Sequence, residues 1–229
     1  METLHGGFTL EITEGVFPLS TDSMVLSGFV HLPKNARVLD LGAGGGCLGL
    51  LLCAKDPGCT VAGVELDERA HRCAVDNIRR NSLSSRLSSI CADLRSIPSL
   101  FSAGGFHCCV SNPPYFDGGP AGRAVPSARR EDHCTLEDLF AAADWALRYG
   151  GDFFLVHRPE RLAQIMHLAC FHHMEPKRIC LVRHRPDSPV SLVLIACRKG
   201  GKPGLRWEEL ILYQSDGTPT EACRKLYHL

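Results

Sequence analysis

A glycine-rich turn at residues 42–46 constrains the fold of this chain more than any other feature of the sequence. The turn, Gly-Ala-Gly-Gly-Gly, follows a short apolar run at 37–41 and precedes an apolar stretch at 48–54. Glycines let a backbone turn sharply and lie against a ligand without intervening side chains. This order predicts a buried strand, a ligand-binding turn and a helix, the first unit of a parallel α/β sheet.

The rest of the chain alternates between short apolar runs and longer helical patterns. Strands are expected at residues 8–13, 37–41, 61–65, 87–91, 106–111, 152–157, 178–182, 190–197 and 209–213. Helices are expected at 21–31, 48–54, 67–81, 135–149, 159–172 and 220–227. Such alternation predicts a doubly wound, mostly parallel α/β sheet of Rossmann-like type. The short loop between residues 182 and 190 predicts one antiparallel strand near the C-terminal end.

The length of 229 residues fits a single domain. We expect a strand and helix extension at 1–35, a core at 36–200 and a C-terminal appendage at 201–229. No run of about 18 apolar residues is present, so no membrane span is expected. The N-terminus has no basic run followed by an apolar segment, so no secretory signal is expected and the predicted location is cytoplasmic.

The twelve cysteines are scattered through apolar runs, and no Cys-x-x-Cys pair occurs among them. A zinc site needs ligands clustered at short spacing, and a disulfide framework is typical of small secreted chains. We therefore expect buried, reduced thiols and no metal site.

Charge is balanced over the whole chain, with 25 basic and 25 acidic residues, but it is distributed unevenly. Residues 177–206 contain eight Lys or Arg and a single acid, Asp187. A local basic patch can attract a polyanion even when the protein is neutral, although a solvated face is the usual role of such a run. The count favours a polyanion-binding segment.

Two acids follow predicted strands beyond the glycine turn. Glu65 ends the second buried strand, nineteen residues after Gly46, where a carboxylate can accept hydrogen bonds from both hydroxyls of a ribose. Asp93 follows the third strand, where it can accept from an adenine amino group or cap a helix. The glycine turn and Glu65 together predict a cofactor that contains adenosine.

The most specific motif is Asn112-Pro113-Pro114-Tyr115, at the end of the fourth core strand. The prolines fix the backbone and remove two amide donors, which leaves the Pro113 carbonyl and the Asn112 side-chain oxygen as acceptors. An aromatic amine is a poor nucleophile because its lone pair is delocalised. Two acceptors that hold its hydrogens turn the lone pair toward a methyl donor, while Tyr115 stacks on the ring.

The series of motifs DLGAGGG, VELD, ADL and NPPY resembles the amino-methyltransferase branch of the class I methyltransferases. The segments at 17–22, 128–139 and 192–200 further resemble the bacterial tRNA adenine-N6 methyltransferases that modify the purine beside the anticodon of a valine tRNA. The resemblance implies S-adenosyl-L-methionine as cofactor, S-adenosyl-L-homocysteine as product and tRNA as substrate. The glycine turn of this chain departs from the family pattern: it carries Gly45-Gly46-Cys47 where relatives often have Ser-Gly-Leu.

The resemblance also implies roles for individual residues. The target base would be held by Asn112, Pro113, Pro114 and Tyr115. The cofactor would contact Thr21, Asp22, Asp40, Gly42, Ala43, Gly44, Glu65, Leu66, Asp93, Leu94 and Asn112. The charge pattern adds Arg129, Arg130, Arg183, Arg185, Lys199 and Lys202 as candidates for RNA binding.

The sequence leaves five other functions open. A release-factor glutamine methyltransferase uses NPPY but has a helical domain before the core, and only about 35 residues precede the first core strand here. A DNA adenine methyltransferase carries a target-recognition domain, for which 229 residues leave little room. An inactive cofactor- or RNA-binding protein would not need NPPY, and an NAD-dependent oxidoreductase leaves it unexplained. Another base amine, in rRNA for example, fits the same pocket chemistry.

Overall fold

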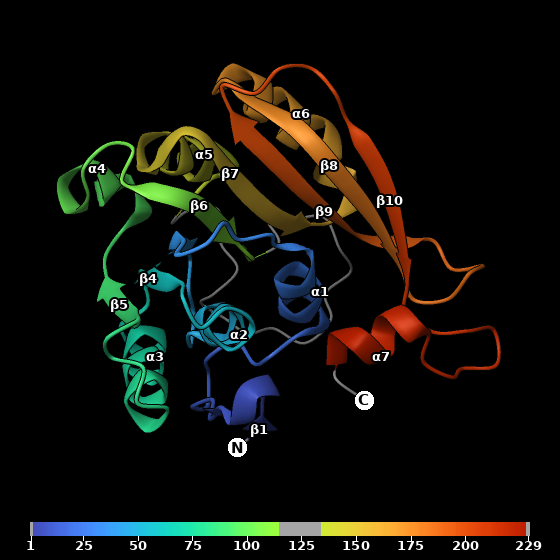
Figure 1. Ribbon diagram of the computed structural model, residues 1–229, viewed down its shortest axis with the longest axis horizontal. Helices are drawn as coiled ribbons and strands as arrows, with labels where there is room; N and C mark the ends of the chain where they lie inside the picture. The colour runs from blue at the N-terminus through green and yellow to red at the C-terminus, as the bar shows by residue number, and fades with distance from the viewer. Residues whose placement is uncertain (1, 115–133, 228–229) are drawn as a thin grey trace.

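The computed structural model describes residues 2–114 and 134–227, which form a three-layer α/β/α arrangement (Figure 1). The central sheet has eight strands in the order β10-β8-β9-β7-β6-β3-β4-β5. Their bounds are β3 Arg37–Leu41, β4 Thr60–Glu65, β5 Leu87–Cys91, β6 Phe106–Ser111, β7 Leu147–His157, β8 Met174–Arg183, β9 Val190–Lys199 and β10 Arg206–Ile211. Only β9 runs antiparallel to its neighbours, β7 and β8. The predicted sheet with one reversed strand is confirmed.

Helices cover both faces of this sheet (Figure 1). One face is covered by α1 Thr21–Phe29, α2 Cys47–Lys55, α3 Glu68–Arg80 and α7 Glu221–Tyr227. The other is covered by α4 Ile97–Leu100, α5 Leu136–Ala146 and α6 Leu162–Phe171. Short 3-10 turns lie at η1 His5–Gly7, η2 Leu94–Ser96 and η3 Pro159–Arg161.

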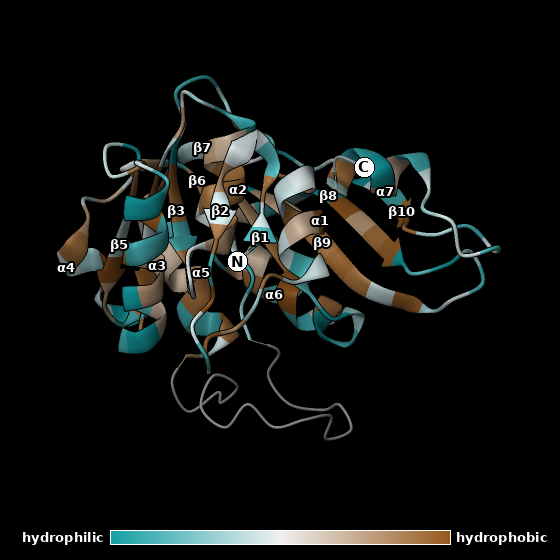
Figure 2. Cartoon of the chain, turned by 90° about the horizontal axis from the view of Figure 1, so that it is seen from below, coloured by the Kyte–Doolittle hydropathy of each residue, from teal (hydrophilic) through white to brown (hydrophobic). Residues whose placement is uncertain are grey.

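The buried strands contribute side chains to two separate hydrophobic cores, because successive side chains of a strand point to opposite faces of the sheet. In β3, Val38 packs with α1 and α2, whereas Leu39 packs with α5. In β7, Phe154 packs on the first face and Phe153 on the second. Figure 2 shows the consequence: β8 and β9 are largely hydrophobic, whereas α3 and α7 display mostly hydrophilic residues.

Two sequence predictions differ from the observed elements. Residues 147–149 were expected to extend the helix that begins after Thr135, but they start β7, where Leu147 pairs with Phe106 of β6 and is fully buried. Pairing and burial in the sheet thus outweigh the local helical pattern. The strand expected at 8–13 is reduced to β2 Thr9–Leu10, which pairs with a short strand, β1 Glu2–Thr3, that the sequence did not indicate.

No helix among residues 2–114 and 134–227 is both long and apolar enough to cross a membrane. All twelve cysteines lie in these segments, and each is a free thiol. Nine are buried, in agreement with the expectation of packed, reduced side chains.

Candidate functional site

The glycine turn lies at the carboxyl end of β3 and is fixed by the neighbouring strand. The amides of Gly42 and Ala43 both donate to the carbonyl of Val64 in β4, at 2.9 and 3.1 Å. Gly42, Gly44 and Gly46 have φ angles of 79°, 54° and 83°, a backbone region that residues other than glycine rarely adopt. The spacing of the glycines is therefore dictated by the shape of the turn.

One side of this turn is packed and the other is open. A Cβ atom on Gly45 would lie 3.0 to 3.4 Å from Ile12, Val16 and Cys73. A Cβ atom on Gly42 or Gly44 would have no atom within 4 Å among the described residues, apart from the adjoining residues of the turn itself. The backbone thus faces free space on the side where an adenosine cofactor is expected to lie.

Asp40 lies in β3, two residues before the glycine turn begins at Gly42. It is 2% exposed, and its Oδ2 accepts no hydrogen bond from the described residues. Burial, and next the charge of Glu65, raises the pKa of Asp40 to about 7. A buried oxygen without a partner is costly, and a donor on a bound ligand would satisfy it. The residues around the turn therefore fit a cofactor that carries amino and hydroxyl donors.

The raised pKa predicts a pH-dependent stability. The folded state binds the Asp40 proton more tightly than the unfolded chain, so the free energy of unfolding falls as pH rises toward 7, by at most about 1.4 kcal/mol per pH unit. Asp40→Asn removes this contribution. Urea denaturation of both proteins between about pH 4.5 and 8 should show the variant gaining stability relative to wild type as pH rises. A constant difference over this range would contradict a protonated, buried Asp40.

Glu65 ends β4 beside the turn, as the sequence indicated. Its Oε2 accepts from the Gly44 amide and its Oε1 from the Asp67 amide, both at 2.8 Å. Burial raises the pKa of Glu65 in spite of these two amides. Each carboxylate oxygen can accept a second hydrogen bond, so the group stays able to bind a ribose. The next residue, Leu66, is 45% exposed and offers an apolar surface to a flat ring.

Asp93 serves as the cap of η2, one of the two roles that the sequence left open. Its Oδ1 accepts from the Arg95 amide at 2.8 Å, and its carboxylate pairs with the Arg95 side chain. Leu94, which follows, is partly buried in the core formed by α4, α5 and α6. The assignment of Asp93 and Leu94 to an adenine pocket stays a prediction.

The Asn-Pro-Pro turn lies next to the glycine turn. Strand β6 pairs in parallel with β3, with Val110 opposite Asp40. Two residues further along these strands, Asn112 and Gly42 begin their respective turns. Ser111, the last residue of β6, is buried, and its hydroxyl donates to the Leu41 carbonyl at 2.7 Å. This hydrogen bond joins the residues that directly precede the two turns.

The Asn112 side chain is oriented by a residue distant in sequence. Its Nδ2 donates to the hydroxyl oxygen of Ser23 in α1, at 3.0 Å. One hydrogen of the amide NH2 group is thereby engaged, and Oδ1 is left as an acceptor. Pro113 is buried and Pro114 exposed, so the turn is anchored on one side only. Tyr115, predicted to stack on the target base, lies outside the described residues.

Thr21 and Asp22 form the first turn of α1, which brings them to the same edge of the sheet as Asn112. The Thr21 hydroxyl oxygen accepts from the Tyr227 hydroxyl at 3.3 Å, so α7 contacts the start of α1. The position of Thr21 and Asp22 near the methionine end of the cofactor stays a prediction.

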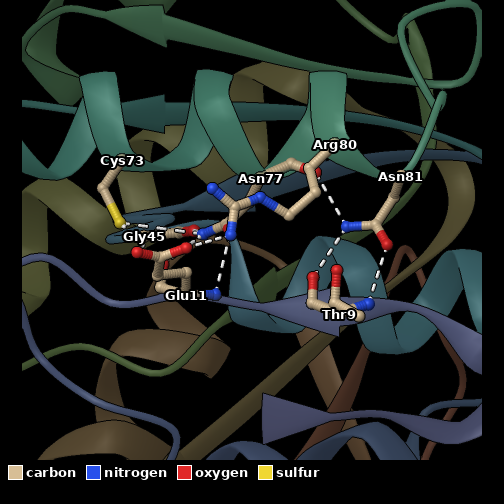
Figure 3. A network of polar contacts seen from close by, with 7 residues as sticks. All are labelled: Thr9, Glu11, Gly45, Cys73, Asn77, Arg80 and Asn81. Carbon is tan, nitrogen blue, oxygen red and sulfur yellow. Dashed lines mark hydrogen bonds and ion pairs between the residues drawn. The ribbon is translucent and has the colours of Figure 1, made fainter. Parts of the chain in front are cut away.

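Asn77 of α3 and Asn81, the residue that caps the C-terminus of α3, hold the N-terminal segment over the packed side of the glycine turn (Figure 3). The Asn77 Oδ1 accepts from the Glu11 amide at 2.9 Å, and its Nδ2 donates to the carbonyls of Glu11 and Gly45 at 2.9 and 3.1 Å. Asn81 makes the equivalent pair with the amide and carbonyl of Thr9. The spacing i, i+4 on the helix matches i, i+2 on an extended chain, a correspondence that the sequence pattern did not reveal.

The candidate RNA-binding residues of 177–206 lie at two opposite edges of the sheet, one formed by the carboxyl ends of its parallel strands and the other by their amino ends. Arg183 ends β8 and Arg185 follows it, at the edge that carries the Asn-Pro-Pro turn. Lys199 ends the reversed strand β9 opposite Met174, the first residue of β8, so Lys199 and Lys202 lie at the far edge. Arg129 and Arg130 lie outside the described residues.

Acids from other elements neutralise several of these basic side chains. Ion pairs join Arg178 to Glu208, Arg183 to Glu209, Arg198 to Asp152 and Lys199 to Asp144. Two of the acids, Glu208 and Glu209, come from β10, which pairs in parallel with β8; both lie just beyond the stretch in which charges were counted. Among residues 2–114 and 134–227, the exposed Arg185 is the candidate for RNA binding at the site edge that forms no such ion pair.

His157, at the carboxyl end of β7, was not singled out by the sequence. It is fully buried, and burial lowers its pKa to about 4, so the imidazole is neutral at neutral pH. Its Nδ1 accepts from the Arg158 amide at 2.8 Å. An isolated histidine in an apolar strand gives no signal that separates a packed side chain from a functional one.

Comparisons with known proteins place the chain in a family. The sequence model of the methyltransferase small domain family matches residues 20–175. A curated tRNA1(Val) (adenine(37)-N6)-methyltransferase from Serratia proteamaculans is 29% identical over 234 residues, covering 97% of this chain and 88% of the relative. The protein of the same name from Bacteroides fragilis is 28% identical over 192 residues, covering 82% of this chain and 80% of the relative.

Solved structures share the fold. One described as a predicted O-methyltransferase from Agrobacterium tumefaciens superposes with a TM-score of 0.77 at 22% identity, over 91% of this chain and 96% of that one. Geranyl diphosphate C-methyltransferase from Streptomyces coelicolor, solved with S-adenosyl-L-homocysteine, gives a TM-score of 0.59 at 14% identity, over 77% of this chain and 79% of that one. These likenesses show a class I methyltransferase fold. With the family match over most of its length, the chain belongs to the methyltransferase small domain family.

Proposed function

We propose that this methyltransferase transfers a methyl group from S-adenosyl-L-methionine to the N6 amine of an adenine in tRNA, beside the anticodon of a valine tRNA. S-adenosyl-L-homocysteine is the product. The names of the curated relatives support the substrate. The observation that carries the proposal is the adjacency of the open glycine turn and the Asn-Pro-Pro turn at one sheet edge.

The residues present suit the cofactor. The open faces of Gly42 and Gly44 leave room for it, Glu65 can hold a ribose, and Asp40 offers a buried acceptor. When bound, S-adenosylmethionine supplies an electrophilic methyl group on a sulfonium.

The contribution of the chain to the reaction is mainly positioning. Asn112 Oδ1 and the Pro113 carbonyl each accept a hydrogen bond from the target amine, and these two bonds localise its lone pair. The base must leave its stack to enter the site, and Tyr115 is proposed to stack on it. No general base is required, because the amine proton can leave to water once the nitrogen has become cationic.

The decisive experiment is methyl transfer from labelled S-adenosylmethionine to total RNA from a strain that lacks this gene, followed by nucleoside mass spectrometry. New N6-methyladenosine in tRNA is the expected result. Label in a protein or DNA fraction instead would retain the methyltransferase and reject the tRNA substrate. Glutamine N5, DNA adenine and rRNA bases are the acceptors that this outcome would then point to.

The separation of the basic residues predicts which of them bind RNA. Arg185→Glu, at the site edge, should weaken tRNA binding about three- to tenfold and reduce its salt dependence. Lys202→Glu, at the far edge, is the matched control and should leave affinity within about twofold. Filter binding across a salt series measures both. Equal losses in the two variants would place the RNA elsewhere.

A further inference from the structure

Ser23 is the buried polar residue of α1 that contacts the proposed acceptor group. It is 5% exposed, and its Oγ lies 3.0 Å from Asn112 Nδ2 although 89 residues separate the two in sequence. No motif in the sequence singles it out, and its place next to Asn112 results from the packing of α1 against the sheet.

The direction of this hydrogen bond has a chemical consequence. A carboxamide has a donor end and an acceptor end that exchange by a half-turn about one bond. With Nδ2 held by Ser23, Oδ1 is the end that remains for the amine of the substrate. In the reversed orientation a donor would face the amine hydrogens, and the transfer geometry would be lost.

Ser23 can hold the amide because α1 is itself fixed at several points. Ser20 caps the helix by accepting from the Ser23 amide. Lys55 Nζ donates to the carbonyls of Ser27, Gly28 and Val30 at 2.9, 3.2 and 2.7 Å, which satisfies the end of the helix. The Tyr227 hydroxyl contacts Thr21. The hydroxyl of Ser23 is therefore presented from a helix anchored at both ends.

We propose that Ser23 is a positioning residue for methyl transfer, whose hydroxyl holds the Asn112 amide with Oδ1 toward the acceptor amine. The identity of that amine rests on the proposed function, whereas the contact between Ser23 and Asn112 does not. The role differs from a structural one because it acts on the rate of transfer and leaves substrate binding unchanged.

The kinetic test uses single-turnover methyl transfer at saturating cofactor and acceptor. Ser23→Ala should slow the transfer about tenfold, while the acceptor concentration that gives half the maximal rate, measured in a separate titration, stays unchanged; Ser23→Thr, which keeps a hydroxyl, should recover to within about threefold of wild type. Ser27→Ala is the matched control, because Ser27 is also buried in α1 but donates to the Met24 carbonyl. It should leave the rate unchanged. Should Ser23→Ala loosen α1, Ser23→Cys, of similar size but a weak acceptor, is expected to show the same loss.

A second measurement is independent of any substrate. The side-chain amide signals of Asn112 in a nitrogen–proton spectrum, assigned by their loss in Asn112→Ala, should shift in Ser23→Ala and stay in place in Ser27→Ala. Asn112 amide signals that keep their chemical shifts in Ser23→Ala, or a Ser23→Ala transfer rate equal to that of wild type, would overturn the proposal. If the wild type methylates an amine other than tRNA adenine, the substrate assignment fails, and the same comparison is made with that acceptor.

Discussion

Replacing Asn112 by alanine is expected to slow methyl transfer by roughly 10²- to 10³-fold, with cofactor affinity within about threefold of wild type. The variant loses one of two acceptors that orient the amine, so the lone pair stays delocalised and misdirected. Single-turnover rates report the loss of the chemical step, and calorimetry with S-adenosylhomocysteine reports cofactor binding.

Asn112→Asp serves as the control for this prediction. It keeps an acceptor oxygen at nearly the same place but replaces the donor that Ser23 holds, so an intermediate rate is expected. Wild-type turnover in Asn112→Ala would remove Asn112 from the mechanism. An equally large loss of cofactor affinity would assign the residue to cofactor binding instead.

The second large effect concerns stability. Asn77→Ala should lower the free energy of unfolding by roughly 2–4 kcal/mol, because it removes the hydrogen bonds to the Glu11 amide and carbonyl and leaves the buried Gly45 carbonyl without the Asn77 donor. Asn77 is 1% exposed, so these hydrogen bonds are shielded from water in the folded wild-type protein. Cofactor affinity should fall as well, since the Gly45 carbonyl belongs to the glycine turn. Urea denaturation and calorimetry measure the two effects.

Asn81→Ala is the matched control, because Asn81 bonds the backbone of Thr9 in the same way but is only partly buried. A loss of about 1–2 kcal/mol is expected there, with cofactor affinity unchanged. Equal effects at the two positions would show that burial and contact with Gly45 do not distinguish Asn77.

Much of the site could be predicted because its parts follow strands directly. Asp40, Glu65 and Asn112 each lie at or just beyond the end of an apolar run, and parallel strands bring their carboxyl ends to one edge. The basic stretch was harder to interpret. Its count ignored Glu208 and Glu209, which β10 places beside Arg178 and Arg183, and it merged residues that the reversal of β9 sends to opposite edges.

The sequence by itself determined the order of strands and helices, the glycine turn and the Asn-Pro-Pro motif, since each depends on residues that are neighbours in the chain. Tertiary structure alone decided that Ser23 holds Asn112, that Asn77 joins the N-terminal segment to Gly45, and that Arg183 is ion-paired. These contacts join residues between 26 and 89 positions apart. A single polar side chain is compatible with many partners, and only the packing of α1, α3 and β10 on the sheet selects one.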